Sequence, residues 1–220
     1  MKLTFIGHAC FRVESDTGLR ILVDPYLPGA FGGKMGLKPY LEPVDIVVST
    51  HEHLDHNHVD PAFGTPKVVK AAAKVHGIEF RGVRLPHDDE EGMRRGWVTG
   101  FRFEVDGVSV LHPGDLGRPP NPEEIASLGP VDVLLLPVGG TFTMGPAQAV
   151  QAVEALRPRI VVPMHYRWPT VDLPLLPVED FLVLANAKHW GVERLSIQPV
   201  AIHPANLPAA TRVYVLSPTH

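Results

Sequence analysis

The stretch His51-Glu52-His53-Leu54-Asp55-His56 brings four metal-binding side chains into six residues. It follows Val44–Val48, a continuous apolar run that is typical of a strand buried on both faces. Residues two apart on an extended segment share a face, so the first two histidines can hold one ion together. A turn beyond them would aim the aspartate and the last histidine at a second ion nearby. The stretch therefore predicts a metal site at the carboxyl end of a buried strand.

Four more predicted strands also end in aspartate or histidine. Their endings are Asp24 after Leu19–Val23, His87 after Ile78–Leu85, His112-Pro113-Gly114-Asp115 after Val108–Leu111, and His165 after Ile160–Val162. In sheets covered by helices, ligand sites assemble at the carboxyl ends of the strands. Five such endings with metal-binding side chains predict one shared site, because packing alone does not require them.

The remaining elements alternate in a pattern that indicates the fold class. Further strands are predicted at Lys2–Ile6, Phe11–Glu14, Phe101–Val105, Val131–Leu136, Arg194–Gln198 and Val213–Leu216, and helices at Lys70–His76, Pro122–Leu128, Pro146–Leu156 and Pro177–Trp190. In each half of the chain, strands come first and are then followed by alternating strands and helices. This order predicts an α/β fold with two sheets and helices outside them. The similarity of Val44–Val48 to Val131–Leu135 leaves an internal duplication open.

Composition excludes several classes of protein. The chain has 220 residues, enough for one domain over residues 1–220, and 45% of them are hydrophobic, enough for a sizeable core. No apolar run reaches the roughly 18 residues of a membrane helix, and polar residues come too early for a signal peptide, so we expect a cytoplasmic protein. With 20 basic and 24 acidic residues, the net charge of −4 argues against nucleic-acid or membrane partners. Cys10 is the single cysteine, so nitrogen and oxygen atoms must bind any metal.

Several motifs resemble those of a known superfamily. The histidine stretch resembles the signature of the metallo-β-lactamase superfamily, and Gly7-His8-Ala9-Cys10-Phe11 resembles the opening of its lactonase-like branch. The stretches Gly139–Gly145 and Pro163-Met164-His165-Tyr166 are similar to motifs of uncharacterised metal-dependent hydrolases in that branch. The resemblance covers nearly the whole chain and keeps the motif order. It implies an αββα sandwich, with helices on the outer faces and a two-metal site at one edge of the sheets.

The resemblance also implies a role for each matching residue. It assigns His51, His53 and His87 to the first metal, and Asp55, His56 and His165 to the second. Asp115 would bridge the two ions. Asp24 would support the histidine stretch from behind without binding metal, as outer carboxylates that orient ligands do. His8, His112, Thr143 and Tyr166 remain candidates for either a supporting role or contact with the substrate.

Two departures from relatives narrow the chemistry. The bridging position holds Asp115 and not cysteine, which separates the site from antibiotic-degrading enzymes with a thiolate ligand. An oxygen bridge favours two ions. The third position of the stretch is His53 and not glutamate, which argues against the diiron oxygen-reducing branch.

The predicted function is hydrolysis by a metal-bound hydroxide. Two divalent ions can supply a hydroxide near neutral pH to attack a carbonyl or phosphoryl centre. Asp55 and Asp115 are the expected catalytic residues, with Asp55 orienting the water or accepting its proton. The expected substrate is a small ester, lactone or phosphoester. Whether it carries a negative charge is left open. The Gly139–Gly145 loop would either offer backbone N–H groups to an anion or serve as a tight connection.

Alternatives remain for the activity, the metal and the assembly. A mononuclear iron oxygenase on the same fold and a non-catalytic metal-binding protein are the rival functions. We expect two zinc ions, with manganese, nickel and iron as the other choices for this ligand set. A homo-oligomer is left open.

The composition also favours a thermophilic source. The chain contains 23 prolines, and it has thirteen arginines, seven lysines and few asparagine, glutamine or cysteine residues. Proline in loops lowers the entropy of the unfolded chain, and scarce amides and thiols limit chemical damage at high temperature. A GC-rich genome is the rival explanation for the proline and arginine content.

Overall fold

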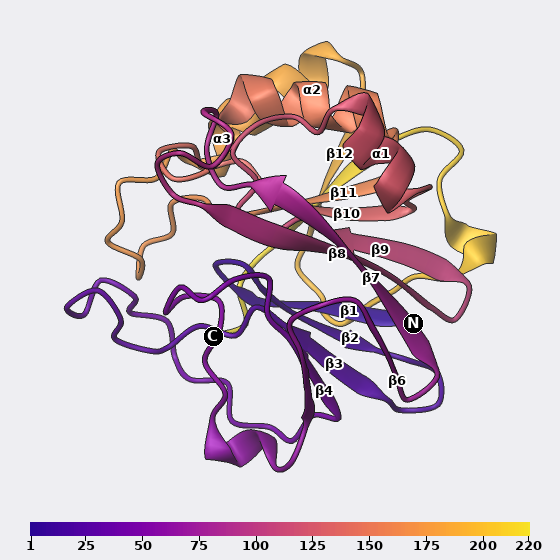
Figure 1. Ribbon diagram of the computed structural model, residues 1–220. Helices are drawn as coiled ribbons and strands as arrows, with labels where there is room; N and C mark the ends of the chain where they lie inside the picture. Colours follow the sequence, from indigo (N-terminus) through magenta and orange to yellow (C-terminus); the bar gives the residue numbers. More distant parts are fainter.

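Two mixed β-sheets pack face to face in the computed structural model, which describes all residues from 1 to 220 (Figure 1). The six-stranded sheet has the order β13 (Val200–Ala201), β1 (Lys2–Gly7), β2 (Cys10–Glu14), β3 (Arg20–Val23), β4 (Ile46–Val48) and β5 (Lys67–Val69). Its first three pairings are antiparallel, and β3, β4 and β5 run parallel. The apolar run Val44–Val48, predicted as a buried strand, contains β4, which is an inner strand of this sheet.

The eight-stranded sheet contains most of the second half of the chain. Its order is β12 (Gly191–Leu195), β14 (Arg212–Leu216), β11 (Ile160–Met164), β10 (Val133–Pro137), β9 (Val108–His112), β8 (Trp97–Val105), β7 (Ile78–Pro86) and β6 (Ala73–Val75). The strands from β12 to β9 are parallel, and those from β9 to β6 are antiparallel. Every residue of β9, β10 and β11 is buried, so these strands lie at the centre of the core.

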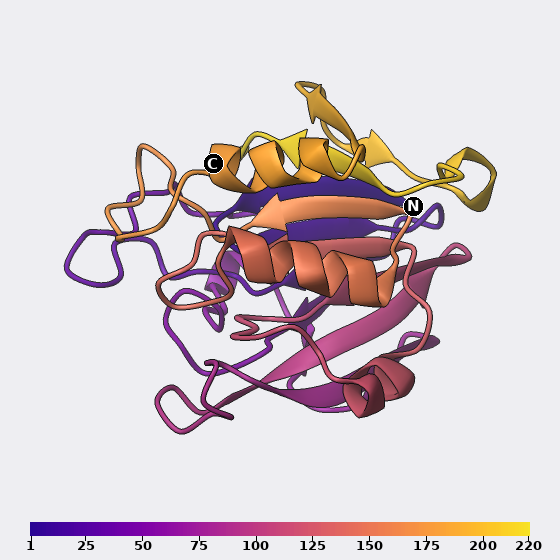
Figure 2. The same cartoon turned by 90° about the horizontal axis from the view of Figure 1, so that it is seen from above.

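Three helices cover the outer face of the eight-stranded sheet: α1 (Pro122–Leu128), α2 (Pro146–Leu156) and α3 (Val178–Ala187). Helices α2 and α3 lie side by side across the parallel strands when the molecule is viewed from above (Figure 2). Asn121 and Glu124 form a capping box at the start of α1, and a proline occupies the first turn of both α1 and α2. No helix in the molecule is long and apolar enough to cross a membrane.

The prediction of two sheets with helices outside is confirmed, but the helices cover one outer face only. The outer face of the six-stranded sheet is covered by the segment 24–45 and by the short 3-10 helix η1 (Pro61–Phe63). Tyr26, Met35 and Tyr40 pack there against Leu22 and Val47 of the sheet. Loop side chains therefore replace a helix on this face.

The predicted helix Lys70–His76 is wrong. The segment contains β6, which pairs antiparallel with β7 in a register that places Val75 opposite Ile78. His76 and Gly77 connect the two strands with φ angles of 49° and 82°. Two left-handed residues are the geometry of a tight hairpin turn, which overrides the helix preference of three consecutive alanines.

Three smaller predictions also differ from the structure. The strand predicted at Arg194–Gln198 lies earlier, at Gly191–Leu195, and α3 is shorter than the predicted Pro177–Trp190. Strands β5 and β13 were not predicted. They have only three and two residues, too few for a periodic pattern to identify them.

The two similar stretches around Asp45 and Asp132 share local structure as well as sequence. Asp45 Oδ2 accepts the N–H of Arg20 at 2.8 Å, and Asp132 Oδ2 accepts the N–H of Ser109 at 2.9 Å. In both cases the aspartate precedes a strand that pairs in parallel with the strand carrying the N–H donor. The open question of an internal duplication thus gains geometric support.

Candidate metal centre

Three strands are each followed directly by a site residue with a left-handed backbone conformation. His8 follows β1, Asp24 follows β3 and His165 follows β11, with φ angles of 56°, 48° and 52°. Non-glycine residues adopt this conformation infrequently, and such strain concentrates at functional sites. The left-handed residue ends each strand at once, so three separate side chains are held at one edge of the sandwich.

Three histidines form the first group of donor atoms. One nitrogen from each of His51, His53 and His87 lies within 4.8 Å of the others. His53 Nδ1 is 2.9 Å from His51 Nε2 and 3.3 Å from His87 Nε2. The structure thus brings together the three residues that the resemblance assigned to one ion.

A second group lies next to the first. Donor atoms of His8, Asp55, His56 and His165 all lie within 4.8 Å of one another. Asp55 Oδ2 is 3.0 Å from His8 Nε2 and 3.5 Å from His56 Nε2. The three residues assigned to the second ion are therefore together, and His8 joins them through Asp55.

Asp115 lies between the two groups. Its Oδ2 is 3.6 Å from His87 Nε2 and 3.3 Å from His165 Nε2, and its Oδ1 is 3.3 Å from His56 Nε2. The carboxylate therefore faces histidines of both groups, which is where a bridging ligand must stand.

Asp24 supports both groups from behind. Its Oδ1 accepts the backbone N–H of Thr50 at 2.8 Å, while Oδ2 accepts the Thr50 hydroxyl at 2.7 Å and lies 2.8 Å from His56 Nδ1. Thr50 Oγ1 is in turn 3.0 Å from His51 Nδ1. Because the hydroxyl hydrogen is directed at Asp24, Thr50 Oγ1 accepts a hydrogen from His51. Both histidines thus carry Nδ1–H, so Nε2, which faces the centre, is the ring nitrogen that can bind a metal.

Burial keeps several of these histidines neutral. It lowers the pKa of His51 to about 3 and the pKa of His8 to about 4, with charge repulsion from neighbouring histidines adding to the effect. Burial also lowers the pKa of His87. Their imidazoles are therefore uncharged at neutral pH, which is the form that binds metal.

The carboxylates in the centre remain ionised in spite of burial. Burial works against their charge, but nearby histidines hold the pKa of Asp24, Asp55 and Asp115 below its ordinary value. The same carboxylates raise the pKa of His56 well above its usual value, again against the effect of burial. Three buried negative charges require positive charge nearby, and divalent cations would provide it.

Five buried polar atoms of the cluster lack hydrogen-bond partners: His8 Nδ1, His56 Nε2, His87 Nδ1, Asp115 Oδ1 and His165 Nδ1. Of these, His56 Nε2 and Asp115 Oδ1 lie 3.3 Å apart without forming a hydrogen bond. Buried polar atoms are nearly always satisfied, and a shared cation is the ligand that would satisfy both. Nitrogen and carboxylate donors in this number fit a site for one or two divalent ions.

The other predicted site residues lie further from the donor groups. His112 is buried beneath Asp24, with Nε2 2.8 Å from the Ala9 carbonyl and Nδ1 3.8 Å from Asp24 Oδ2. Its Nδ1 accepts the Gly114 N–H at 3.2 Å, so this fully buried ring joins the backbone at Ala9 to that at Gly114 and is not placed to contact a substrate. The Thr143 hydroxyl donates to the Met144 carbonyl at 3.4 Å, outside the cavity above the centre.

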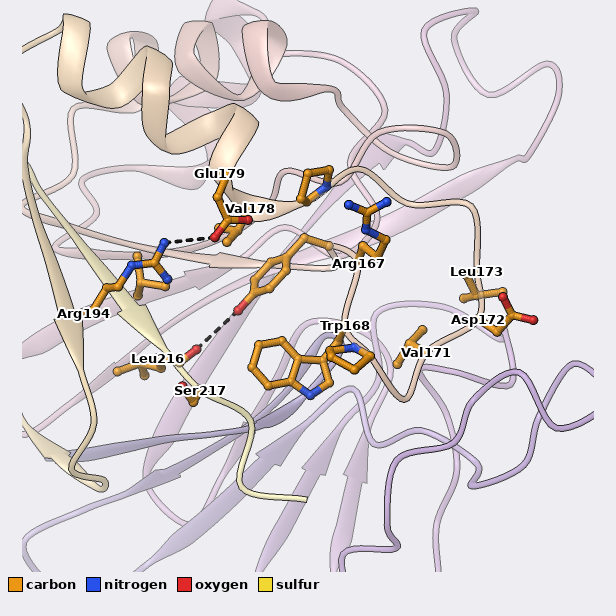
Figure 3. Close-up of a pocket in the computed structure, with 14 residues that line it drawn as sticks. Arg167, Trp168, Val171, Asp172, Leu173, Val178, Glu179, Arg194, Leu216 and Ser217 are labelled. Carbon is orange, nitrogen blue, oxygen red and sulfur yellow. Dashed lines mark hydrogen bonds and ion pairs between the residues drawn. The ribbon is translucent and has the colours of Figure 1, made fainter.

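Tyr166 lines a separate pocket of about 620 Å³, which contains none of the donor residues (Figure 3). Its hydroxyl donates to the Leu216 carbonyl at 3.3 Å. Trp168 lines the same pocket, which an ion pair between Arg194 and Glu179 borders. The structure therefore does not bring Tyr166 to the donor groups.

The Gly139–Gly145 loop is a tight connection. Its backbone N–H groups at Gly140, Phe142 and Thr143 donate within the loop, and that of Met144 donates to Leu116. The N–H of Gly145 donates to the Gln148 side chain. Five of the seven backbone N–H groups in the loop are thus already used, so the structure favours the second of the two roles considered for this loop.

A cavity of about 450 Å³ opens above the donor groups. Besides site residues from both groups, it is lined by Phe31, Lys34, Arg95, Phe142, Leu173 and Pro174. Sequence reasoning missed these six because they belong to four different loops and to no metal-binding pattern. Only the position of Phe142, in a glycine-rich stretch already singled out, gave any signal.

Two glycines of the 139–145 loop provide a matched test of how closely this loop supports the centre. A Cβ at Gly139 would lie 2.1 Å from the His165 carbonyl oxygen, whereas a Cβ at Gly145 would meet nothing within 4 Å. We expect Gly139→Ala to destabilise the fold by about 1–3 kcal/mol and to weaken metal binding by displacing His165. Gly145→Ala should cost no more than about 1 kcal/mol and leave metal affinity unchanged. Denaturant unfolding and metal titration of the two variants check this, and equal effects would contradict it.

The comparisons with known proteins agree with this geometry. The sequence-family model described as the β-lactamase superfamily domain matches residues 2–165 of this chain. A UPF0173 metal-dependent hydrolase of Thermococcus onnurineus is 34% identical over 199 residues, covering 78% of this chain and 87% of the relative. The crystal structure of a candidate zinc-dependent hydrolase from Thermotoga maritima is 32% identical with a TM-score of 0.76, over 98% of this chain and 97% of that one.

Two packed sheets with a histidine–aspartate centre at one edge define a protein of the metallo-β-lactamase superfamily. Within it, the chain belongs to the UPF0173 family of metal-dependent hydrolases. A diiron β-hydroxylase of Streptomyces venezuelae also resembles the chain, at 21% identity and a TM-score of 0.58, over 86% of this chain and 50% of that one. At that level of identity it shares the fold alone.

Proposed function

We propose that the protein hydrolyses an ester, lactone or phosphoester with two divalent ions held at the centre. One ion would be held by His51, His53 and His87, the other by Asp55, His56 and His165, with Asp115 between them. The observation that supports this proposal is the position of Asp115, whose carboxylate faces histidines of both groups at 3.3–3.6 Å. Zinc is the ion we expect, and the ligand set also suits manganese, nickel and iron.

The residues of the chain have distinct tasks in such a reaction. Divalent ions at this site would supply Lewis acidity and a nucleophile from water near neutral pH. Asp55 lines the cavity and is ionised, so it can orient the attacking water and accept its proton. His8 Nε2, 3.0 Å from Asp55 Oδ2, holds that carboxylate in position. The cavity above the groups, about 450 Å³, is large enough to admit a small molecule.

Metal analysis combined with a substrate panel tests this function. We expect the protein saturated with zinc or manganese to contain two ions per chain and to cleave at least one generic ester, lactone or phosphodiester. Saturation at one ion would contradict the two-ion centre. A single iron ion with oxygen consumption would instead favour an oxygenase, and two ions with no turnover on any class would favour a non-catalytic role.

We also propose that the protein is thermostable, in keeping with its proline-rich and amide-poor composition. The metal-loaded protein should melt above the roughly 45–65 °C that is usual for mesophilic domains. Calorimetry with the metal kept saturating checks this, because bound ions raise the apparent midpoint by themselves. A melting temperature inside that range would contradict thermostability and would favour genome bias as the reason for the composition.

A further inference from the structure

The cavity above the donor groups contains two cationic side chains that the proposed chemistry does not use. Lys34 and Arg95 line it together with the apolar side chains of Phe31, Phe142 and Leu173. Its only lining carboxylates are Asp55 and Asp115, which belong to the donor groups. The part of the cavity away from the centre is therefore positively charged and partly apolar.

The position of Lys34 is fixed by two loops that pair with each other. The Asp172 N–H donates to the Lys34 carbonyl at 2.8 Å, and Met35 forms a β-bridge with Val171. These loops project from the same end of the sandwich in Figure 1, where the purple segment after β3 lies near the orange segment after β11. The pairing holds the lysine backbone at the rim of the cavity.

The position of Arg95 is fixed by a buried carboxylate. Asp88 Oδ2 accepts the backbone N–H groups of Arg94 at 2.9 Å and Arg95 at 2.7 Å, while its Oδ1 accepts two more from the same loop. A Cβ at Gly117 would lie 2.2 Å from the Asp88 backbone nitrogen, so the loop packs closely on the next segment. The backbone that carries the Arg95 side chain is therefore held on both sides.

Neither cation has an acidic partner, although neighbouring arginines do. Arg94 pairs with Glu90, and Arg118 pairs with Glu91 and Glu124. The Arg95 guanidinium meets only the Thr141 carbonyl at 3.4 Å and the face of Phe142, 4.9 Å from its ring centre. Lys34 has no carboxylate within 4.0 Å. Both charges are available to a ligand in the cavity.

We propose that the substrate is an amphipathic anion whose negative group lies beyond the bond that is cleaved. Arg95 and Lys34 would bind that group, a carboxylate or a phosphate, while Phe31, Phe142 and Leu173 contact the apolar part next to it. Guanidinium and ammonium groups together suit either anion, and an apolar wall strengthens the charged contacts by excluding water. This proposal rests on the hydrolytic function proposed above, and it assigns the two residues to specificity and not to the chemical step.

Three esters with the same leaving group test the proposal in the metal-loaded protein. They are 4-nitrophenyl hexanoate, mono-4-nitrophenyl adipate and the carboxylic 4-nitrophenyl ester of 5-phosphonopentanoate, which share four methylenes and differ only in the remote methyl, carboxylate or phosphonate group. We expect kcat/KM to be higher for at least one charged ester than for the neutral hexanoate. The charged ester with the higher kcat/KM shows which anion the protein prefers. Arg95→Gln and Lys34→Gln should each lower that value about tenfold and lower the value for hexanoate by clearly less, because hexanoate has no charge to lose contact with. Arg94→Gln, a neighbour paired with Glu90 and outside this cavity, is the matched control.

A binding measurement separates this proposal from the proposed hydrolysis. Calorimetry with 4-phenylbutanesulfonate and the neutral 4-phenylbutanol reports recognition of charge without turnover. The wild type should prefer the sulfonate, and the Arg95→Gln/Lys34→Gln double variant should lose that preference. If no ester is cleaved but this preference holds, the hydrolytic function fails while the anion site stands. Equal sulfonate binding by wild type and double variant, no binding by the wild type, or equal losses on charged and neutral esters would overturn the proposal.

Discussion

Replacing Asp115 with alanine is expected to lower the metal content from two ions per chain to one and to reduce hydrolysis to background. The side chain is buried and faces His56, His87 and His165 at 3.3–3.6 Å, so its loss affects both donor groups. The three-histidine group keeps all its nitrogens and can still hold one ion. The loss of activity should exceed the roughly 10–100-fold that changes behind the ligands cost. Elemental analysis and hydrolysis assays measure both effects.

The fold should survive this substitution because Asp115 stands at the edge of the sheets and not in the apolar core. Asp89→Ala, an exposed aspartate outside both donor groups, provides the control and should leave metal content and activity unchanged. Circular dichroism should show folded protein for both variants. Wild-type metal content and activity in Asp115→Ala would show that this carboxylate does not bridge two ions.

The positions of the donor residues were predictable because each follows an apolar strand in the sequence. Val47-Val48 leads to His51 in the six-stranded sheet, and Val161-Val162 leads to His165 in the eight-stranded sheet. Parallel strands end at the same edge of their own sheet, and the packing of the two sheets places those edges together, although the residues are more than a hundred positions apart. The structure adds Thr50, which joins Asp24 to His51 through its hydroxyl, and it shows which of the two roles considered for His8 fits, since His8 Nε2 contacts Asp55.

Features set by turns and loops could not be predicted in the same way. The alanines before His76 favour a helix locally, and the hairpin there depends on pairing with β7 and on two left-handed residues. Lys34 and Arg95 reach the cavity through loop pairing and through the backbone bonds of Asp88, contacts with no sequence period. Periodicity identifies strands, whereas the shape of this cavity depends on individual long-range hydrogen bonds.

Asp24→Asn is expected to weaken metal binding by both groups, although Asp24 is not assigned to either ion. The carboxylate accepts from Thr50 twice and fixes Nδ1–H on His56 directly and on His51 through Thr50. An amide has one acceptor oxygen, and its NH₂ group would face hydrogens that the carboxylate now accepts. The histidines would then move or change tautomer and lose the Nε2 lone pair from the centre. We expect metal affinity to fall about 10–100-fold.

Asp132→Asn is the matched control for this prediction, because Asp132 makes nearly the same contacts away from the centre. Its Oδ2 accepts the N–H of Ser109 at 2.9 Å and the Ser109 hydroxyl at 2.7 Å, as Asp24 does with Thr50. Both variants lose a charged acceptor, so each should cost about 1–3 kcal/mol of unfolding free energy. Only Asp24→Asn should change the metal dissociation constants. Equal metal affinity in the two variants would mean that Asp24 stabilises the loop after β4 without orienting the histidines that it carries.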